Sequence, residues 1–255
     1  MSAGIGLSEL GAIESIFTPR NIAGLSLWLD ASQIAGLSGT DSLATWPDLS
    51  GNGNDAVQST EGFKPTYQTD VINGLPVVRF DGTDDYLSAT DSASLQPADL
   101  TIFIVSNFSS LKEGDQKFFA KSRNSESAAG ATWQTTIYEA NDLLYQTKNA
   151  GSWQSVAAND YIYTGAYITT ITHNQSTEAV NIYKDGSAFS TSSSITQAFD
   201  YATDPLYIGA RINGSTIEHH LQGDIAEMII YDSALSTVGR GKVETYLADK
   251  YGITI

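Results

Sequence analysis

Cysteine is absent from this chain of 255 residues. Its absence excludes a disulfide framework and any mechanism that uses a cysteine nucleophile. A domain of this length does not need disulfides, so the absence constrains the cellular compartment only weakly. The sequence also lacks a Gly-x-Ser-x-Gly turn of the hydrolase type, and it therefore offers no recognisable serine or cysteine nucleophile.

Basic residues are scarce in this chain. Lys and Arg together number 13 against 29 Asp and Glu, which gives a formal net charge of -16. Such a surface favours solubility and repels the phosphates of nucleic acid and the anionic surface of a membrane. We therefore expect no nucleic-acid partner.

Long apolar runs are missing as well. No stretch approaches the roughly 20 apolar residues of a membrane span, so we expect no membrane insertion. Residues 1–20 lack the basic start and the continuous apolar core of a secretion signal. We expect the chain to stay in the cytoplasm or to leave by another route, for example in a virus particle assembled in a bacterial cytoplasm.

The residues that are present favour an all-β domain. The composition is 41% hydrophobic, and 22 Gly and 13 Tyr suit many short strands joined by turns. Apolar or β-branched patterns typical of strands occur at residues 75–80, 100–105, 168–172, 179–183 and 225–231. The densest of these, residues 100–105, predicts a central strand covered on both faces. Asp185-Gly186 predicts a tight hairpin turn that needs positive φ.

Two helices are expected, one at each end. Residues 8–17 predict a short helix capped by Ser8, with an apolar face that includes Leu10, Ile13 and Ile16. Residues 236–251 predict a longer helix that ends at Gly252 and covers the edge of the sandwich. We divide the chain into an N-terminal arm, residues 1–20, and a β-sandwich domain, residues 21–255. The arm docks either on a partner or on its own sandwich.

Several motifs occur in a characteristic order. They are Leu-Trp-Leu-Asp at 27–30, Trp-Pro-Asp-Leu-Ser-Gly-Asn-Gly-Asn at 46–54, Phe-Asp-Gly-Thr-Asp-Asp-Tyr-Leu at 80–87, Gly-Asp-Ile-Ala-Glu-Met-Ile-Ile-Tyr-Asp at 223–232 and Ala-Leu-Ser at 234–236. In this order and at this separation, they resemble the laminin-G-like jelly-roll domains of the concanavalin A-like lectin/glucanase superfamily. The resemblance implies an antiparallel β-sandwich, a jelly roll, from about residue 21 onwards. It says less about function, because this superfold hosts sugar binders, glycan-cleaving enzymes and structural modules.

No catalytic pair is expected from the sequence. Glycan-cleaving relatives place two carboxylates across the scissile bond, and the glucanase pattern Glu-x-Asp-x-x-Glu is absent. Asp224 and Glu227 are the nearest pair, but their odd separation places them on opposite faces of a strand unless a bulge intervenes. A lyase could use His173 with Tyr167, but no partner motif accompanies them, and surface or hairpin histidines are the favoured interpretation.

Calcium is the candidate cofactor. Asp48, Ser50 and Asn52 match the opening half of a calcium loop, where alternate oxygen ligands surround the ion. The closing glutamate is missing, because Ser59 stands there, and the alternative is a structural turn whose side chains cap backbone groups. The carboxylates at residues 81, 84 and 85 form a second candidate cluster.

Sugar binding requires an exposed aromatic ring and neighbouring polar side chains. Trp133, Tyr138, Tyr145 and Trp153 lie outside the resemblance motifs, among Gln and Asn residues, and form the predicted carbohydrate site. The alternative is that these aromatic residues are buried in the core.

We interpret the chain as a non-enzymatic, virion-associated binding or decoration protein, such as a phage head decoration or tail adhesion protein, with surface glycans as candidate ligands. The expected partners are virion proteins or further copies of itself, as a homo-oligomer. The expected location is the virion, or alternatively the extracellular space or the cell surface. One alternative function is a polysaccharide-active glycoside hydrolase or lyase. Another is a purely structural capsid or tail component without sugar affinity.

Overall fold

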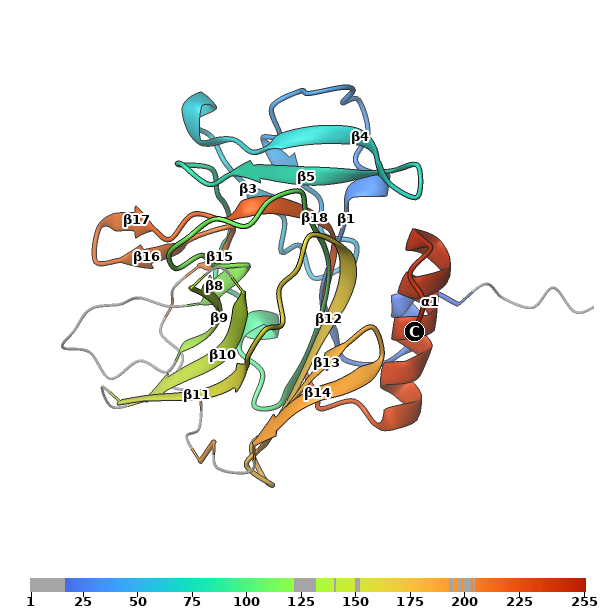
Figure 1. Ribbon diagram of the computed structural model, residues 1–255, viewed down its shortest axis with the longest axis vertical. Helices are drawn as coiled ribbons and strands as arrows, with labels where there is room; N and C mark the ends of the chain where they lie inside the picture. The colour runs from blue at the N-terminus through green and yellow to red at the C-terminus, as the bar shows by residue number, and fades with distance from the viewer. Residues whose placement is uncertain are drawn as a thin grey trace, which may run out of the picture.

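The computed structural model describes residues 17–121, 132–139, 141–149, 152–192, 195–196, 199, 203 and 205–255. The helix expected over residues 8–17 therefore lies outside the described residues, apart from Phe17. The architecture is mostly antiparallel β-structure with one C-terminal helix, which confirms the predicted fold class (Figure 1). Among the described residues, no helix is long and apolar enough to cross a bilayer.

The strands are β1 (Leu25–Asp30), β2 (Thr45–Trp46), β3 (Ala56–Val57), β4 (Thr66–Ile72), β5 (Leu75–Asp81), β6 (Leu87–Ala89), β7 (Leu100–Phe108), β8 (Phe119–Lys121), β9 (Thr132–Tyr138), β10 (Asp142–Asn149), β11 (Ser152–Ala158), β12 (Gly165–Asn174), β13 (Ala179–Lys184), β14 (Ser187–Ser192), β15 (Leu206–Ile208), β16 (Arg211–Asn213), β17 (Thr216–Glu218) and β18 (Gln222–Tyr231). The helix α1 spans Thr237–Tyr251, and short 3₁₀ turns lie at Pro19–Asn21, Ala31–Gln33, Glu61–Phe63 and Ala93–Leu95.

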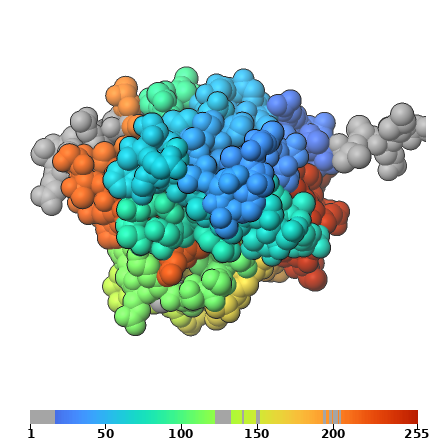
Figure 2. Space-filling view, turned by 90° about the horizontal axis from the view of Figure 1, so that it is seen from above, coloured from blue at the N-terminus to red at the C-terminus, as the bar shows by residue number. Residues whose placement is uncertain are grey.

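Two sheets form the sandwich. The first sheet has the order β14-β13-β12-β7-β18-β5-β4, and β1 pairs with the C-terminal half of β18. The second sheet has the order β11-β10-β9-β8-β15-β6-β3-β2. A hairpin of β16 and β17 stands apart from both sheets. This orange hairpin and the red helix lie at opposite ends of the molecule in both views (Figures 1 and 2).

The first sheet is covered on both of its faces. Its inner side chains, such as Phe80 and Ile104, pack against the second sheet in the main core. Its outer side chains, such as Phe103 and Val105, pack under α1 in a second apolar cluster. This arrangement confirms the expectation that the strand at residues 100–105 is buried on both faces, and it follows from five of these six residues being apolar, with Thr101 the exception.

The predicted C-terminal helix is confirmed, with one difference in placement. Ser236 caps it by accepting a hydrogen bond from the Gly239 amide at 3.2 Å, and Gly252 ends it in the left-handed conformation. We expected this helix to cover an edge of the sandwich, but it covers the outer face of the first sheet. Its buried residues Val243 and Leu247 meet the apolar outer side chains of that sheet, which would otherwise face water.

The hairpin between β13 and β14 forms as predicted. Asp185 and Gly186 both have positive φ, at 47° and 73°. Two such residues in succession match the right-handed twist of the flanking strands, which explains the choice of an Asp-Gly pair here.

A buried carboxylate joins α1 to the first sheet. The two oxygens of Glu227 on β18 accept hydrogen bonds from Trp28 Nε1 at 2.7 Å, Tyr246 OH at 3.1 Å, Tyr251 OH at 2.9 Å and Lys250 Nζ at 2.7 Å. Burial, and then the neighbouring charge of Asp30, raise the pKa of Glu227 to about 7 although Lys250 opposes the shift.

The described part of the N-terminal arm packs on the sandwich. Pro19 is buried, and its carbonyl accepts a hydrogen bond from Tyr231 OH at 2.8 Å. The ring of Phe17 meets the ring of Tyr246 edge to face, with centroids 6.1 Å apart. Arg20 Nε donates to the carbonyl of Leu49 at 2.7 Å. Residues 17–20, which the sequence division placed in the arm, are therefore anchored to the sandwich.

The Glu227→Gln variant should change how stability depends on pH. An unfolded glutamate titrates near 4.5, and the folded carboxyl has its pKa near 7, so the folded state holds the proton more tightly. Wild-type stability must then fall as pH rises from about 4.5 to about 7, and the glutamine variant lacks this fall. Between pH 4 and pH 8, the melting temperature of the wild type should fall relative to that of the variant as the pH rises.

Glu61→Gln is the matched control, because Glu61 is exposed and pairs only at the surface with Lys64. Its difference from wild type should change little over the same pH range. A difference in melting temperature between wild type and Glu227→Gln that does not change with pH would contradict the raised pKa of Glu227.

Candidate functional site

The outer face of the second sheet carries a ladder of aromatic rings. Tyr86 precedes β6, and its ring lies 6.0 Å from that of Phe63 and 6.1 Å from that of Tyr207, measured between centroids. Phe63 is 39% exposed, so the far end of the ladder is open to solvent. Neighbouring rings held at this spacing form an apolar surface on which a flat ligand can stack.

A row of polar side chains continues from the ladder across the same face. Tyr207 lies opposite Ala120, which lies opposite Gln134, and Gln134 in turn lies opposite Gln146 on β10. Residues paired in this way project from the same face, so the amide of Gln134 lies about 10 Å, or two strand spacings, from the start of the ladder.

The polar row is linked by hydrogen bonds. Gln134 Nε2 donates to Gln146 Oε1 at 3.0 Å, and the hydroxyl of Thr136 donates to the same oxygen. The hydroxyl of Thr136 accepts in turn from Lys117 Nζ. Gln134 Oε1 is buried and has no hydrogen-bond partner. An unpaired amide oxygen on a face lined with polar groups marks a place where a ligand donor would be stabilising.

Lys117 gives this row a charge that depends on pH. Its side chain is buried, and burial, followed by repulsion from Arg211, lowers its pKa to about 7. Arg211 on β16 is itself paired with Glu218 at 2.6 Å. Near neutral pH, the ammonium of Lys117 is therefore only partly protonated, and a bound carboxylate or hydroxyl acceptor would favour its charged form.

The predicted carbohydrate residues separate onto two faces. Trp133 and Tyr145 are wholly buried in the main core, so neither ring offers a face to a sugar, and this part of the prediction is wrong. Tyr138 and Trp153 point outward and are 41% and 38% exposed. The reason is the two-residue period of a strand, which turns position 133 inward and position 134 outward.

The two outward aromatic residues do not share one subsite. Tyr138 lies opposite Asp142 at one end of β10, and Trp153 lies opposite Lys148 near the other end. The separation along the strand is about 20 Å. Lys148 Nζ lies 5.3 Å from the centroid of the Trp153 ring, which holds that ring in place.

The proposed lyase pair is not assembled. His173 is buried, its Nδ1 lies 3.0 Å from Tyr145 OH, and burial lowers its pKa to about 4. Tyr167 is also buried, six positions earlier on β12, which is about 20 Å along a strand. Tyr145 and His173 instead join the two sheets through the core.

Asp224 and Glu227 lie on the same face of β18, which contradicts the expectation that they lie on opposite faces. A bulge at Ala226 lies between them, so that Asp224 pairs with Asn107 and Glu227 with Val105 on β7, and both acids project from the same outer face. They are nevertheless engaged separately. Arg79 holds Asp224 through two hydrogen bonds at 2.7 and 2.9 Å, and α1 covers Glu227. Neither carboxylate is free to act on a substrate.

The predicted calcium loop is a structural turn. Asp48 Oδ1 accepts from the amides of Trp28 and Ser50, and Oδ2 accepts from the Ser50 hydroxyl and the Asn54 amide, at 2.7 to 3.0 Å. These four donors fill the acceptor positions of the carboxylate. The amide nitrogen of Asn52 binds the carbonyl of Ser26 at 3.1 Å. Asp48, Ser50 and Asn52 thus have no free oxygen set for a cation.

The second acidic cluster is more compact. One carboxylate oxygen from each of Asp81, Asp84 and Asp85 lies within 4.8 Å of the others, a spacing that could hold a cation. Two of these groups also cap the turn, because Asp81 Oδ1 accepts from the Thr83 amide at 2.7 Å and Asp85 Oδ2 accepts from the Asp81 amide at 2.9 Å. Burial raises the pKa of Asp85 to about 6.

The predicted carbohydrate residues lie on β9, β10 and β11, and two of these strands also carry Gln134 and Gln146, but the sequence did not point to the aromatic ladder. Tyr86 lay within a motif that was assigned to the fold, and Tyr207 and Phe63 carried no signal of their own. Lys117 could have been noticed as a lysine next to apolar strand residues in a chain with few basic groups.

The Asp48→Ala variant should destabilise the protein by about 2 to 4 kcal/mol, because it leaves part-buried backbone donors without an acceptor. The loss should be equal in EDTA and in millimolar calcium, since no oxygen of Asp48 is available to a cation. Urea unfolding under both conditions measures it, with Asp41→Ala as a control at an exposed turn. The opposite result would support a calcium site: EDTA would lower the melting temperature of the wild type and leave that of Asp48→Ala unchanged.

Solved structures with the same fold include several binding domains. The CBM40 of the Ruminococcus gnavus IT-sialidase, bound to alpha2,3 sialyllactose, aligns with a TM-score of 0.52 and 14% identity over 63% of this chain and 91% of that one. The binding domain of botulinum neurotoxin serotype D aligns with a TM-score of 0.64 and 12% identity over 88% of this chain and 51% of that one. For the binding domain of Paraclostridial Mosquitocidal Protein 1 the values are 0.63 and 15% over 91% and 53%.

At these identities the likeness shows the fold alone, and this chain spans about half the length of the two toxin domains. Among curated proteins, none matches the sequence. The family model described as the Concanavalin A-like lectin/glucanases superfamily matches residues 81–237, more than half of the chain. The chain therefore belongs to the concanavalin A-like lectin/glucanases superfamily, as its motifs suggested.

Proposed function

We propose that this protein is a non-enzymatic glycan-binding module that holds an oligosaccharide on the outer face of its second sheet. The observation that carries the proposal is the unpaired, buried oxygen of Gln134, which lies in a polar row beside the aromatic ladder. A sugar presents an apolar ring face and a rim of hydroxyl groups. The ladder supplies a surface for the first and the row supplies donors and acceptors for the second.

Further support comes from a difference between the two sheets in how their faces are covered. The first sheet is occupied on both faces, by the main core and by α1. On the second sheet, the outer side chains of Tyr138, Gln146 and Trp153 remain at least partly exposed. A ligand on this face would meet aromatic and amide groups without any change in the core.

Sialylated and neutral oligosaccharides are the first probes. The similar structures include a carbohydrate-binding module bound to sialyllactose and a neurotoxin binding domain in complex with SialylT. Lys117 and Arg211 near the polar row would favour an acidic sugar, and the overall charge of -16 opposes one. Sialyllactose compared with lactose separates these two effects.

The non-enzymatic part of the proposal rests on the acidic groups. Asp224 is held by Arg79, and Glu227 is covered by α1, so the nearest carboxylate pair is not available for general acid catalysis. We expect no release of reducing ends or unsaturated products from polysaccharides incubated with the protein.

Association with a virion, as a head decoration or tail adhesion protein and as a homo-oligomer, stays a prediction from the sequence. Co-purification with virus particles tests it. Because this test does not involve the second sheet, its result is independent of glycan binding.

The Tyr86→Ala and Gln146→Ala variants should each weaken glycan binding at least 10-fold, or about 1.4 kcal/mol, because they remove a stacking ring and a hydrogen-bonding amide. A glycan array on the intact protein identifies the ligand, and calorimetric titration measures the affinities. Phe189→Ala is the matched control, since Phe189 on β14 is exposed to 42%, close to Phe63, but belongs to the first sheet.

Trp153→Ala and Tyr138→Ala tell how far the site extends along β10. Loss of affinity for long but not short oligosaccharides would place an outer subsite at that ring. Full affinity in the Tyr86 and Gln146 variants, or no binding to any glycan by the wild type, would overturn the proposed function.

A further inference from the structure

Three ionisable side chains meet under the last turn of α1. Asp30 ends β1 and lies opposite Glu227 of β18, so the two carboxyl groups project side by side from the outer face of the first sheet. Lys250 extends from α1 and contacts both, with Nζ 2.5 Å from Asp30 Oδ2 and 2.7 Å from Glu227 Oε2. One amine is thereby held against two acids.

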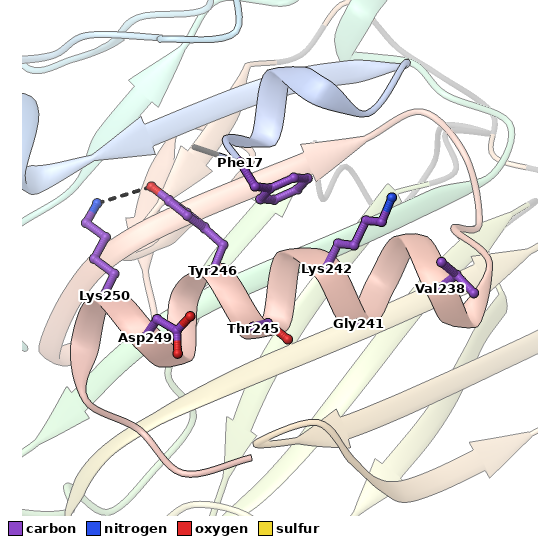
Figure 3. Close-up of a pocket in the computed structure, with 8 residues that line it drawn as sticks. All are labelled: Phe17, Val238, Gly241, Lys242, Thr245, Tyr246, Asp249 and Lys250. Carbon is purple, nitrogen blue, oxygen red and sulfur yellow. Dashed lines mark hydrogen bonds between the residues drawn. The ribbon is translucent and has the colours of Figure 1, made fainter. Parts of the chain in front are cut away.

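The three groups are largely shielded from solvent. Asp30 and Glu227 are buried, and the side chain of Lys250 is 17% exposed. Nζ of Lys250 lies 5.6 Å and 5.1 Å from the ring centroids of Tyr246 and Tyr251, and Figure 3 shows it turned toward the hydroxyl of Tyr246. These two rings restrict the movement of the amine away from the acids.

The carboxyl group of Asp30 is oriented toward the amine. Its Oδ1 accepts hydrogen bonds from the amide of Ser32 at 2.9 Å and from the hydroxyl of Ser32 at 2.7 Å. These bonds fix Oδ1 on Ser32 and leave Oδ2 on Lys250. Two donors on Oδ1 would also stabilise the negative charge that forms on this oxygen when a nucleophile attacks Cγ.

We propose that Lys250 and Asp30 condense to form an isopeptide bond, with Glu227 as the proton relay. The ammonium of Lys250 carries three protons. One passes to Asp30 Oδ2 and a second to Glu227 Oε2, the two oxygens that Nζ contacts, while the electron pair of the nitrogen forms a bond to Asp30 Cγ. Glu227 then gives its proton to Oδ2, the bond between Cγ and Oδ2 breaks, and that oxygen leaves as water. The third proton stays on the amide nitrogen, and Glu227 returns to its starting state.

Glu227 is suited to the relay. Burial raises its pKa to about 7, so this carboxyl group can both accept and release a proton near neutral pH. The water also has a way out, because Asp30, Lys250 and Trp28 line a hollow that is open to the surface.

The bond would join two residues that lie 220 positions apart in the sequence and would tie α1 to β1 covalently. A cross-link that closes so long a loop restricts the unfolded chain and so favours the folded one. Burial of Glu227 persists after the bond forms, so the pH dependence expected for Glu227→Gln above still applies.

Intact mass spectrometry of the denatured full-length protein tests the proposal. The wild type should be about 18 Da lighter than its sequence mass, which is the loss of one water. After digestion with trypsin, the peptide that contains Asp30 should be joined to the peptide that contains Lys250, and no cleavage should occur after Lys250. The Lys250→Arg and Glu227→Gln variants should have their full sequence masses, because they lack the amine and the relay.

Lys121→Arg is the matched control. Lys121 also contacts an acid, Asp91, at 2.5 Å, and its side chain is buried. Because Lys121 takes no part in the proposed bond, this variant should show the same loss of about 18 Da as the wild type.

Three outcomes would overturn the proposal. A wild type at its full mass, before and after a day of incubation at neutral pH, would mean that Lys250 and Asp30 form an ion pair only. A loss of water that persists in Lys250→Arg, or that maps to Asp81-Gly82 or Asp185-Gly186 as a cyclic imide, would place the reaction elsewhere in the chain. A linked peptide formed by Glu227→Gln at the wild-type yield would exclude Glu227 as the relay.

Discussion

One buried carboxyl group connects the layers of this protein. Glu227 lies on the central strand β18 and receives hydrogen bonds from β1 through Trp28 and from α1 through Tyr246, Lys250 and Tyr251. A carboxylate in this position would cost several kcal/mol if it had no partners, and loss of one partner typically costs about 3 to 5 kcal/mol. The strand, its neighbour and the helix can therefore separate only if these shared hydrogen bonds are broken, and this fixes α1 in its position on the first sheet.

The position of α1 decides where a ligand can be bound. The helix covers the outer face of the first sheet, and the apolar side chains of that face pack against it. Polar groups on the same face are paired with each other, as Asp224 is with Arg79. The second sheet has no comparable helix over its described strands, and its outer face carries Tyr86, Gln134 and Gln146. The placement of a single helix therefore leaves the outer face of the second sheet for the proposed ligand.

The sequence predicted the layers better than it predicted the site. The strand at residues 100–105, the Asp-Gly turn and the C-terminal helix depend on local patterns, and all three formed as expected. The carbohydrate residues depend on which face each side chain takes, and that is set by strand register. A shift of one position separates Trp133 in the core from Gln134 on the outer face, and composition cannot resolve it. The bulge at Ala226 had the same effect on the two acids of β18, because one inserted residue reversed the expected faces.

The polar clusters of this protein differ in whether every buried hydrogen-bonding atom has a partner. The carboxylate of Asp48 has four donors for its four acceptor positions, and Glu227 likewise has four donors, so each is explained by the contacts it already makes. Gln134 has one oxygen without a donor, on a face that also offers aromatic rings and Lys117. An unpaired buried acceptor lowers the stability of the free protein, and a ligand hydroxyl that pairs with it recovers the loss on binding. Other buried polar atoms without a partner, such as Trp133 Nε1 and His173 Nε2, belong to side chains of the core. Gln134 differs from them because it projects from the outer face of its sheet, and this is why it supports the proposed binding face.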